Sequence, residues 1–182
     1  MSILITKSKN KMFFDTLPAI KITNYNSDCV YKNIYSYIKC YIYNNSLQIC
    51  FSIFNNPSPE NQMFGGVLAF NKNKNNKIFF TCDNVGNITF KSNTSRKVVS
   101  NVAIKTTGQD EQGHYCNYEF EISKTLLQNF KGENSLENSF LGNFFIFCND
   151  NLKFHGSVFQ TASVDFNKIE DINVDEFTIV DY

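Results

Sequence analysis

Apolar and polar residues alternate with a period of two along much of this chain, in short segments separated by Asn, Gly, Asp and Ser. Residues 34–43 show the pattern clearly, because Ile34, Ile38 and Ile42 fall on one face while tyrosines and a lysine fall on the other. Successive side chains of a β-strand point to opposite faces, so this segment has one core-facing side and one wetter side. The alternation therefore predicts an all-β protein.

Turn residues divide the alternating segments into about nine expected strands, with a further possible one at residues 158–161. We expect strands at 34–43, 47–54, 65–70, 77–82, 87–90, 98–106, 115–122, 141–148 and 176–180. Asn44 and Asn45 are expected to form a tight turn, since Asn tolerates left-handed backbone angles. One short helix is expected from its Ser123 cap to Phe130, ended by Gly132. Together these elements predict an antiparallel, two-sheet, jelly-roll-like β-sandwich with one short helix.

Chain length and net charge limit the number of domains and the classes of binding partner that we expect. The 182 residues contain no Pro/Gly/Ser-rich linker and no fixed repeat, so residues 1–182 are expected to form a single domain. Lys and Arg number 17, as do Asp and Glu, and the formal net charge is zero. Without a basic field to neutralise phosphates, we expect neither a nucleic acid nor a membrane as partner. The oligomeric state is left open.

Two sequence features indicate the cellular compartment: the N-terminal residues and the spacing of the cysteines. No basic run followed by an apolar stretch begins at Met1, and no segment approaches the roughly 18 apolar residues of a membrane span. The expectation is a cytoplasmic protein. The cysteines lack CxxC or close Cys/His spacing, so free thiols and no zinc site are expected at positions 29, 40, 50, 82, 116 and 148.

No signature of catalysis is present, such as a phosphate-binding glycine loop, a GxSxG elbow or an HExxH helix. Glu119 and Glu121 would lie about 7 Å apart on one strand face, within the range of inverting glycosidases, but any solvated strand face produces such a pair. Asp110 and Glu111 are either solvated loop charges or oxygen ligands for Ca²⁺. We expect a protein that is not an enzyme, with no certain cofactor; Ca²⁺ and the metal content stay open.

Two segments, 108–122 and 142–157, combine amides, carboxylates and histidine with aromatic rings. A sugar needs this combination, because its C–H surfaces pack on rings and its hydroxyls bond to planar polar groups. The candidate ligands are Gln109, Glu111, Tyr115, Asn117, Asn143, Phe145 and His155. Residues 144–147 are apolar on both faces, as in a central strand, so a core position is the alternative for Phe145. His155 is expected in a loop, whereas His114 is read as a surface residue.

These segments, in their order and spacing, resemble the family-nine carbohydrate-binding-module-like proteins of the DOMON-type β-sandwich superfamily. The resemblance extends from Leu17-Pro18 through the polar loop of 108–115, the strand of 119–122 and the Gly142-Asn143-Phe144-Phe145 strand, and on to the His155-Gly156-Ser157 loop and residues 176–182. It implies a non-catalytic sandwich that holds a terminal sugar between two tryptophans, with structural Ca²⁺ nearby. This chain has no tryptophan, so no such pair carries over.

The leading prediction is a non-catalytic carbohydrate-binding domain that recognises a small sugar or the end of a glycan. The alternative is a structural or protein-interaction β-sandwich that has lost the sugar site. The polar loop at 108–115 favours the first, and the missing secretion signal favours the second. An enzyme acting on glycosides is the third reading, and it requires a carboxylate pair in one cleft.

Overall fold

The computed structural model describes residues 2–25, 35–55, 62–69, 76–93, 98–111, 113–129, 136, 138–148, 153–161, 164, 168 and 171–182. Strands dominate the described part. They are β1 (Ile3–Ser8), β2 (Ile20–Lys21), β3 (Asn24–Tyr25), β4 (Tyr35–Tyr43), β5 (Ser46–Asn55), β6 (Gln62–Ala69), β7 (Ile78–Cys82), β8 (Asn87–Ser92), β9 (Val99–Val102), β10 (Ile104–Asp110), β11 (Gly113–Ile122), β12 (Ser139–Cys148), β13 (Lys153–Ser157) and β14 (Asp175–Asp181). A 3-10 turn, η1 (Phe14–Thr16), and one helix, α1 (Lys124–Asn129), complete the elements.

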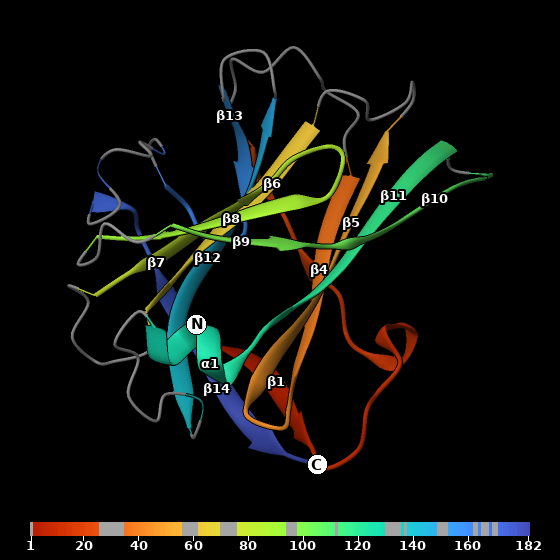
Figure 1. Ribbon diagram of the computed structural model, residues 1–182. Helices are drawn as coiled ribbons and strands as arrows, with labels where there is room; N and C mark the ends of the chain where they lie inside the picture. The colour runs from red at the N-terminus through yellow and green to blue at the C-terminus, as the bar shows by residue number, and fades with distance from the viewer. Residues whose placement is uncertain are drawn as a thin grey trace.

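All of these strands belong to one hydrogen-bonded sheet. Its main path has the order β10-β11-β5-β4-β1-β14-β12-β6-β7-β8-β9, while β2 pairs with β4, β13 with β12, and β3 with β13. The sheet bends into two facing layers, one of β10, β11, β5 and β4, the other of β12 and β6 to β9, with β1 and β14 joining them (Figure 1). At the opposite edges, β9 and β10 follow each other in the chain with only Ala103 between them. The result is a nearly closed, barrel-like sandwich.

The prediction of an all-β chain with one short helix is confirmed, but two details of it are wrong. The layers are continuous through hydrogen bonds rather than two separate sheets, and the sheet is mixed, because β1 runs parallel to both β4 and β14. In the parallel pair of β1 and β14, Ile5 lies beside Ile179, so the N-terminal and C-terminal strands of the chain pair with each other. Local alternation predicts a strand but says nothing about the direction of its neighbour.

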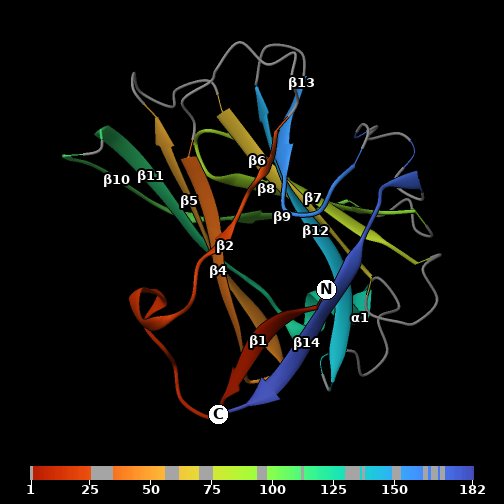
Figure 2. The same cartoon turned by 180° about the vertical axis from the view of Figure 1, so that it is seen from behind.

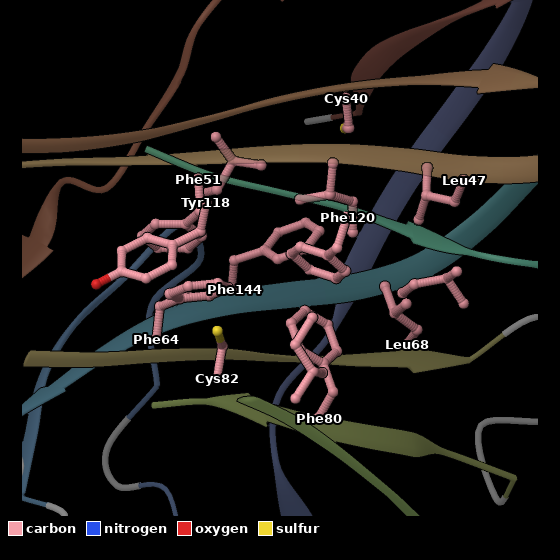
Figure 3. Packing of buried hydrophobic residues seen from close by; sticks show 14 of the residues in the cluster. Cys40, Leu47, Phe51, Phe64, Leu68, Phe80, Cys82, Tyr118, Phe120 and Phe144 are labelled. Carbon is pink, nitrogen blue, oxygen red and sulfur yellow. The ribbon is translucent and has the colours of Figure 1, made fainter. Parts of the chain in front are cut away.

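Rings from the two layers pack against one another in the core (Figure 3). Phe51 of β5 stacks on Phe64 of β6 with ring centroids 4.3 Å apart, and Phe80 of β7 meets Phe120 of β11 at 5.5 Å. These strands are not hydrogen-bonded neighbours, so the contacts show that the layers face each other. Burial of these large rings is the main favourable term for the fold.

Several local predictions are confirmed. Asn44 and Asn45 have φ values of 51° and 58° in the β4–β5 turn, which asparagine tolerates better than other residues with a Cβ. Ser123 accepts a hydrogen bond from the backbone N–H of Leu126 at 3.2 Å, which caps α1, and Leu126 and Leu127 pack into the core. Phe130 and Gly132, the expected end of this helix, lie outside the described residues.

Other elements differ from expectation. The expected strand at 98–106 is two strands, β9 and β10, which separate at Ala103 where the chain crosses from one layer to the other. The expected polar loop at 108–115 is mostly the β10–β11 hairpin, and residues 158–161 form bends rather than a strand. Strands β1, β2, β3 and β13 were not expected; they are short or lack a clear alternation, and pairing with neighbours makes them strands.

Candidate functional site

Two of the sequence-predicted ligands, Asn143 and Phe145, lie in the interior on β12, and both have 0% exposed surface. The Asn143 amide donates to the carbonyls of Phe159 and Asn173 at 2.9 and 3.1 Å, and its oxygen accepts from the N–H groups of Phe144 and Phe159 at 2.9 and 3.0 Å. Phe145 packs in a second cluster with Phe79, Phe147, Val67, Ile172 and Val174. Both residues hold a loop onto the sheet and present nothing to a ligand in this structure.

His155 is in strand β13, not in a loop. Ile146 pairs with Gly156 and Phe147 with Phe154, so His155 is the extra residue of a β-bulge in the β12–β13 pair. The His155 side chain lies outside the described part of the structure. Bulges often redirect a side chain next to a functional site, so its ligand role stays a prediction.

The remaining four predicted ligands belong to the β10–β11 hairpin, on the other layer. Tyr115 and Asn117 alternate with the core residues Cys116 and Tyr118, so they face away from the core. Gln109 pairs with His114 and therefore lies on the opposite face of the hairpin from Tyr115. Glu111 is exposed in the turn. The structure thus brings Tyr115 and Asn117 together, but it separates them from Asn143 and Phe145.

The face of the β4–β5–β11–β10 layer that points away from the core, here called the outer face, carries an aromatic row. Tyr35, Phe54, Tyr115 and Gly108 occupy equivalent positions on four adjacent strands. The Tyr35 and Phe54 rings are 5.8 Å apart, the Phe54 and Tyr115 rings 5.9 Å, and Tyr37 lies 5.7 Å from Phe54. We call Tyr35, Tyr37, Phe54 and Tyr115 the aromatic platform.

Glycine at position 108 leaves room for the Tyr115 ring, which any larger residue would displace. A Cβ there would lie 2.4 Å from the Tyr115 ring, which is closer than any real contact. The Tyr115 ring therefore extends over the β10 backbone and prolongs the platform toward the edge of the sheet. All four platform rings retain exposed surface, and Tyr35 keeps the most, at 40%.

A polar row follows the aromatic one. Lys21 of β2, Tyr37, Ser52, Asn117 and Thr106 are successive cross-strand neighbours on the same face. The side-chain oxygen of Asn117 is buried and has no hydrogen-bond partner among the described residues, unlike the saturated Asn143. An unused buried acceptor costs about 1–3 kcal/mol, so it is a natural partner for a donor that approaches this face.

A charged row comes next, with Lys39, Cys50 and Glu119 side by side on β4, β5 and β11. Burial raises the pKa of the Cys50 thiol to about 11, which the hydrogen bond to Ser52 at 3.9 Å opposes only in part; Glu119 raises it further and Lys39 lowers it. The thiol stays protonated at neutral pH. It is therefore a poor nucleophile and a poor metal ligand. The aromatic and polar rows give the outer face the groups of a binding surface.

The N-terminal segment covers the part of the outer face around Tyr41. Phe14 of η1 packs edge-on against Tyr41 at 5.6 Å, and the backbone N–H of Met12 donates to the Tyr41 hydroxyl at 3.3 Å. Tyr41 is consequently buried, although it lies on the tyrosine side of β4 that the alternation predicts to be wetter. The platform lies beyond this cover, at the end of the layer where β4 begins and β5 ends.

Sequence reasoning missed Tyr35, Tyr37, Phe54, Lys21 and Lys39 as site residues. The tyrosine face of residues 34–43 was a usable signal, since a solvent-facing row of tyrosines is uncommon on an ordinary strand. Which neighbours complete that row depends on register, and two strands of similar alternation can pair in more than one register.

A separate groove of about 620 Å³ lies between the two pairs of strands that connect the layers. On one side β1 and β14 connect them, and on the other β2 and β3 run from the edge of β4 to β13 (Figure 2). The groove is mainly apolar, and Lys21 and Asp175 are its charged members; the other lining residues are Ile3, Leu4, Pro18, Ala19, Ile20, Val158 and Phe159.

The described residues contain neither a cluster of metal ligands nor a membrane-spanning helix. No three His, Cys, Asp or Glu side chains come together there as a metal site would require, so Ca²⁺ stays an open prediction. No helix in that part of the chain is long and apolar enough to cross a membrane. Cys40, Cys50, Cys82 and Cys116 are free thiols, whereas Cys29 and the side chain of Cys148 lie outside the described part.

Comparisons with known proteins identify the fold. No family model and no curated protein sequence matches this chain. Among solved structures, a protein from Bacteroides uniformis to which carbohydrate binding is ascribed superposes with a TM-score of 0.70 at 9% identity, over 98% of this chain and 99% of that one.

A family 9 carbohydrate-binding module from Caldicellulosiruptor kristjanssonii is also similar, in two structures. Its complex with cellotriose superposes with a TM-score of 0.55 and its complex with glucose with 0.56, each at 9% identity and over 98% of this chain, and over 94% and 96% of the module. The chain therefore has the fold of the family 9 carbohydrate-binding modules, as its sequence motifs indicated.

Proposed function

We propose that this protein is a non-catalytic carbohydrate-binding domain whose binding surface is the outer face around the aromatic platform. The observation that carries the proposal is the cross-strand register, which sets an aromatic row directly beside a polar row. Rings supply surface for the C–H faces of a sugar, and the amide and hydroxyl groups supply partners for its hydroxyls. The shared fold with carbohydrate-binding modules supports the same class of ligand.

The dimensions of the surface suit a small glycan. Neighbouring strands are about 4.8 Å apart, so the aromatic row extends about 14 Å from β4 to β10, and the polar row lies about 7 Å from it. This area accommodates one or two sugar rings. Hydrogen bonds between uncharged groups contribute only about 0.5–1.5 kcal/mol each, so for a neutral sugar we expect an affinity near the millimolar range.

Titration with mono- and disaccharides, followed by heteronuclear NMR or calorimetry, tests the proposal. Tyr35→Ala, Tyr115→Ala and Asn117→Ala should each weaken binding at least severalfold. Tyr182→Ala is the matched control, because Tyr182 is a tyrosine with 90% of its surface exposed at the C-terminal end of the chain. Sugar binding that survives all three of these outer-face substitutions would move the site elsewhere, with the His155 bulge as the next place to test.

A specific observation also keeps the protein-interaction alternative open. Strand β10 is at an edge of the sheet, and Ile104 on it and Val102 just before it have 70% and 67% exposed surface. An exposed edge strand offers unpaired backbone groups to another chain. If no sugar binds even at high concentration, this edge becomes the leading candidate for function.

A further inference from the structure

We propose that the glycan bound at the platform carries a negatively charged group, a carboxylate of the uronic acid type, and that Lys21 and Lys39 bind it. This inference rests on the proposed function, since it concerns the same surface. It names a class of sugar that neither the fold nor the aromatic platform requires, and two residues outside the sequence-predicted set.

Both lysines lie on the outer face at the β4 end of the platform. Lys21 pairs directly with Tyr37, and Lys39 follows Tyr37 by two residues on the same strand. The Lys21 ammonium lies 5.8 Å from the centre of the Tyr35 ring, and the Lys39 ammonium lies 5.5 Å from the centre of the Tyr37 ring. Two positive charges thus lie over the rings on which a sugar would pack.

Neither lysine forms an ion pair with a carboxylate among the described residues, although Asp15 of η1 and Glu119 both act on Cys50, the cross-strand neighbour of Lys39. The ammonium groups of the two lysines instead make cation–π contacts with the rings of Tyr35 and Tyr37. Glu119 shares the row of Lys39 but is two strands away, about 9–10 Å at the usual strand spacing. Asp175 borders the groove that Lys21 also lines, and it accepts a hydrogen bond from the N–H of Glu176.

The distribution of charge also gives the ligand a direction. Lys21 and Lys39 lie at the β2 and β4 side, whereas Glu119 is on β11 and Asp110 is at the end of β10. An acidic group is attracted to the first side and repelled from the second, while the uncharged amide of Asn117 lies between them. Hydrogen bonds to a charged acceptor are about twice as strong as those between neutral groups, so lysines favour a carboxylate over a hydroxyl.

The test compares sugars that differ only in this group. Glucose with glucuronate, and galactose with galacturonate, are titrated into the full chain at low and at moderate salt. We expect each uronate to bind about tenfold more tightly than its neutral partner at low salt, with a smaller ratio at 200 mM salt because the contact is partly exposed.

Lys21→Gln and Lys39→Gln should each reduce the affinity for the uronate about threefold or more, and should reduce it by a larger factor than the affinity for the neutral sugar. Lys91→Gln is the matched control, since Lys91 is an exposed lysine on β8 in the other layer. Far-ultraviolet circular dichroism and the urea midpoint verify that each variant is folded. Lys39→Gln is the cleaner variant, because Lys39 does not border the groove.

Equal binding of uronate and neutral sugar, unaffected by the lysine substitutions, would overturn this inference and leave the proposed function standing. Absence of binding by either kind of sugar would overturn both. Binding of acetate as tight as that of glucuronate would also overturn it, because the charge alone would then explain the contact and the rings would play no part.

Discussion

Strands β11 and β12 are both ten residues long and carry most of the sequence-predicted ligands, yet their surroundings differ. Both faces of β12 are buried, because the main core lies on one side and residues Ile172 and Val174 cover the other. On β11 the core lies on one side only, and Tyr115, Asn117 and Glu119 keep exposed surface on the other. Whether a sheet face becomes core or binding surface depends on the segment that crosses it.

Two asparagines show the same contrast. Asn143 of β12 makes four hydrogen bonds, which fill both its donor and its acceptor positions. Asn117 of β11 has a buried acceptor oxygen for which the described part of the chain supplies no partner. A saturated amide stabilises the fold, whereas an unused acceptor is available to an incoming donor at a cost to stability. Four predictions challenge or refine this comparison.

The largest expected effect concerns the covered face of β12. Phe145→Ala should lower the free energy of unfolding by about 3–5 kcal/mol, since it removes a fully buried ring and leaves a cavity. The matched substitution Phe54→Ala on the outer face should lower it by only about 1 kcal/mol, because that ring is partly exposed. Urea denaturation measures both; equal losses would mean that the outer face is core as well.

Asn143→Ala is expected to lower the free energy of unfolding by about 3 kcal/mol. The substitution leaves two N–H groups and two carbonyls without their hydrogen-bond partner, in a buried region where water does not easily replace the lost amide. Asn117→Ala should cost less than about 1 kcal/mol in the same urea titration. A large loss from Asn117→Ala would show that this amide also serves the fold, and it would weaken the case for a ligand contact.

The turn of residues 83–86 joins the layers, and its stability should depend on pH. The carbonyl of Asn84 accepts from Lys105 Nζ at 2.6 Å and from the Tyr118 hydroxyl at 3.3 Å, so the turn contacts β10 and β11. Asp83 accepts from the N–H groups of Val85, Gly86 and Asn87 at 2.8–2.9 Å and from the Asn87 amide at 2.9 Å. Burial acts to raise the pKa of Asp83, but these hydrogen bonds outweigh it and lower the pKa.

A lowered carboxyl pKa contributes stability above the unfolded value of about 3.9 and loses it as the pH falls through the lower folded value. Asp83→Asn should therefore cost about 1–2 kcal/mol at pH 7. The difference from the unmodified protein should shrink as the pH falls below about 4. A difference that stays constant down to pH 2 would contradict this assignment; unfolding curves across that range decide it.

The smallest expected effect is a gain. Ser36 of β4 is fully buried on the core side, and no described residue forms a hydrogen bond with its hydroxyl. Ser36→Ala should raise the free energy of unfolding by about 0.5–1 kcal/mol, because it removes a buried polar group that nothing satisfies. Ser52→Ala on the outer face is the control. A loss of stability from Ser36→Ala would indicate a partner for the hydroxyl.

Alternation alone predicts which residues of β4 and β11 face the core, as Ile38, Ile42, Cys116 and Tyr118 show. It also predicts the central position of β12, whose apolar residues occur on both faces. It does not predict the platform, because Tyr35, Phe54 and Tyr115 come from three separate strands and meet only through their register. The sequence indicates Tyr115 and Asn117 as candidate ligands, but their neighbours on the outer face belong to β4 and β5 and not to β12.

The sequence by itself determined the β class, the turn at Asn44 and Asn45, the cap at Ser123 and the core faces of the longer strands, because these depend on neighbours a few residues apart. Tertiary structure alone decided that β1 pairs in parallel with β14, that the N-terminal segment buries Tyr41, and that Phe145 is covered while Phe54 is not. Each of these contacts joins residues far apart in the chain. Their free energy depends on which surfaces meet after folding, and no local pattern encodes that.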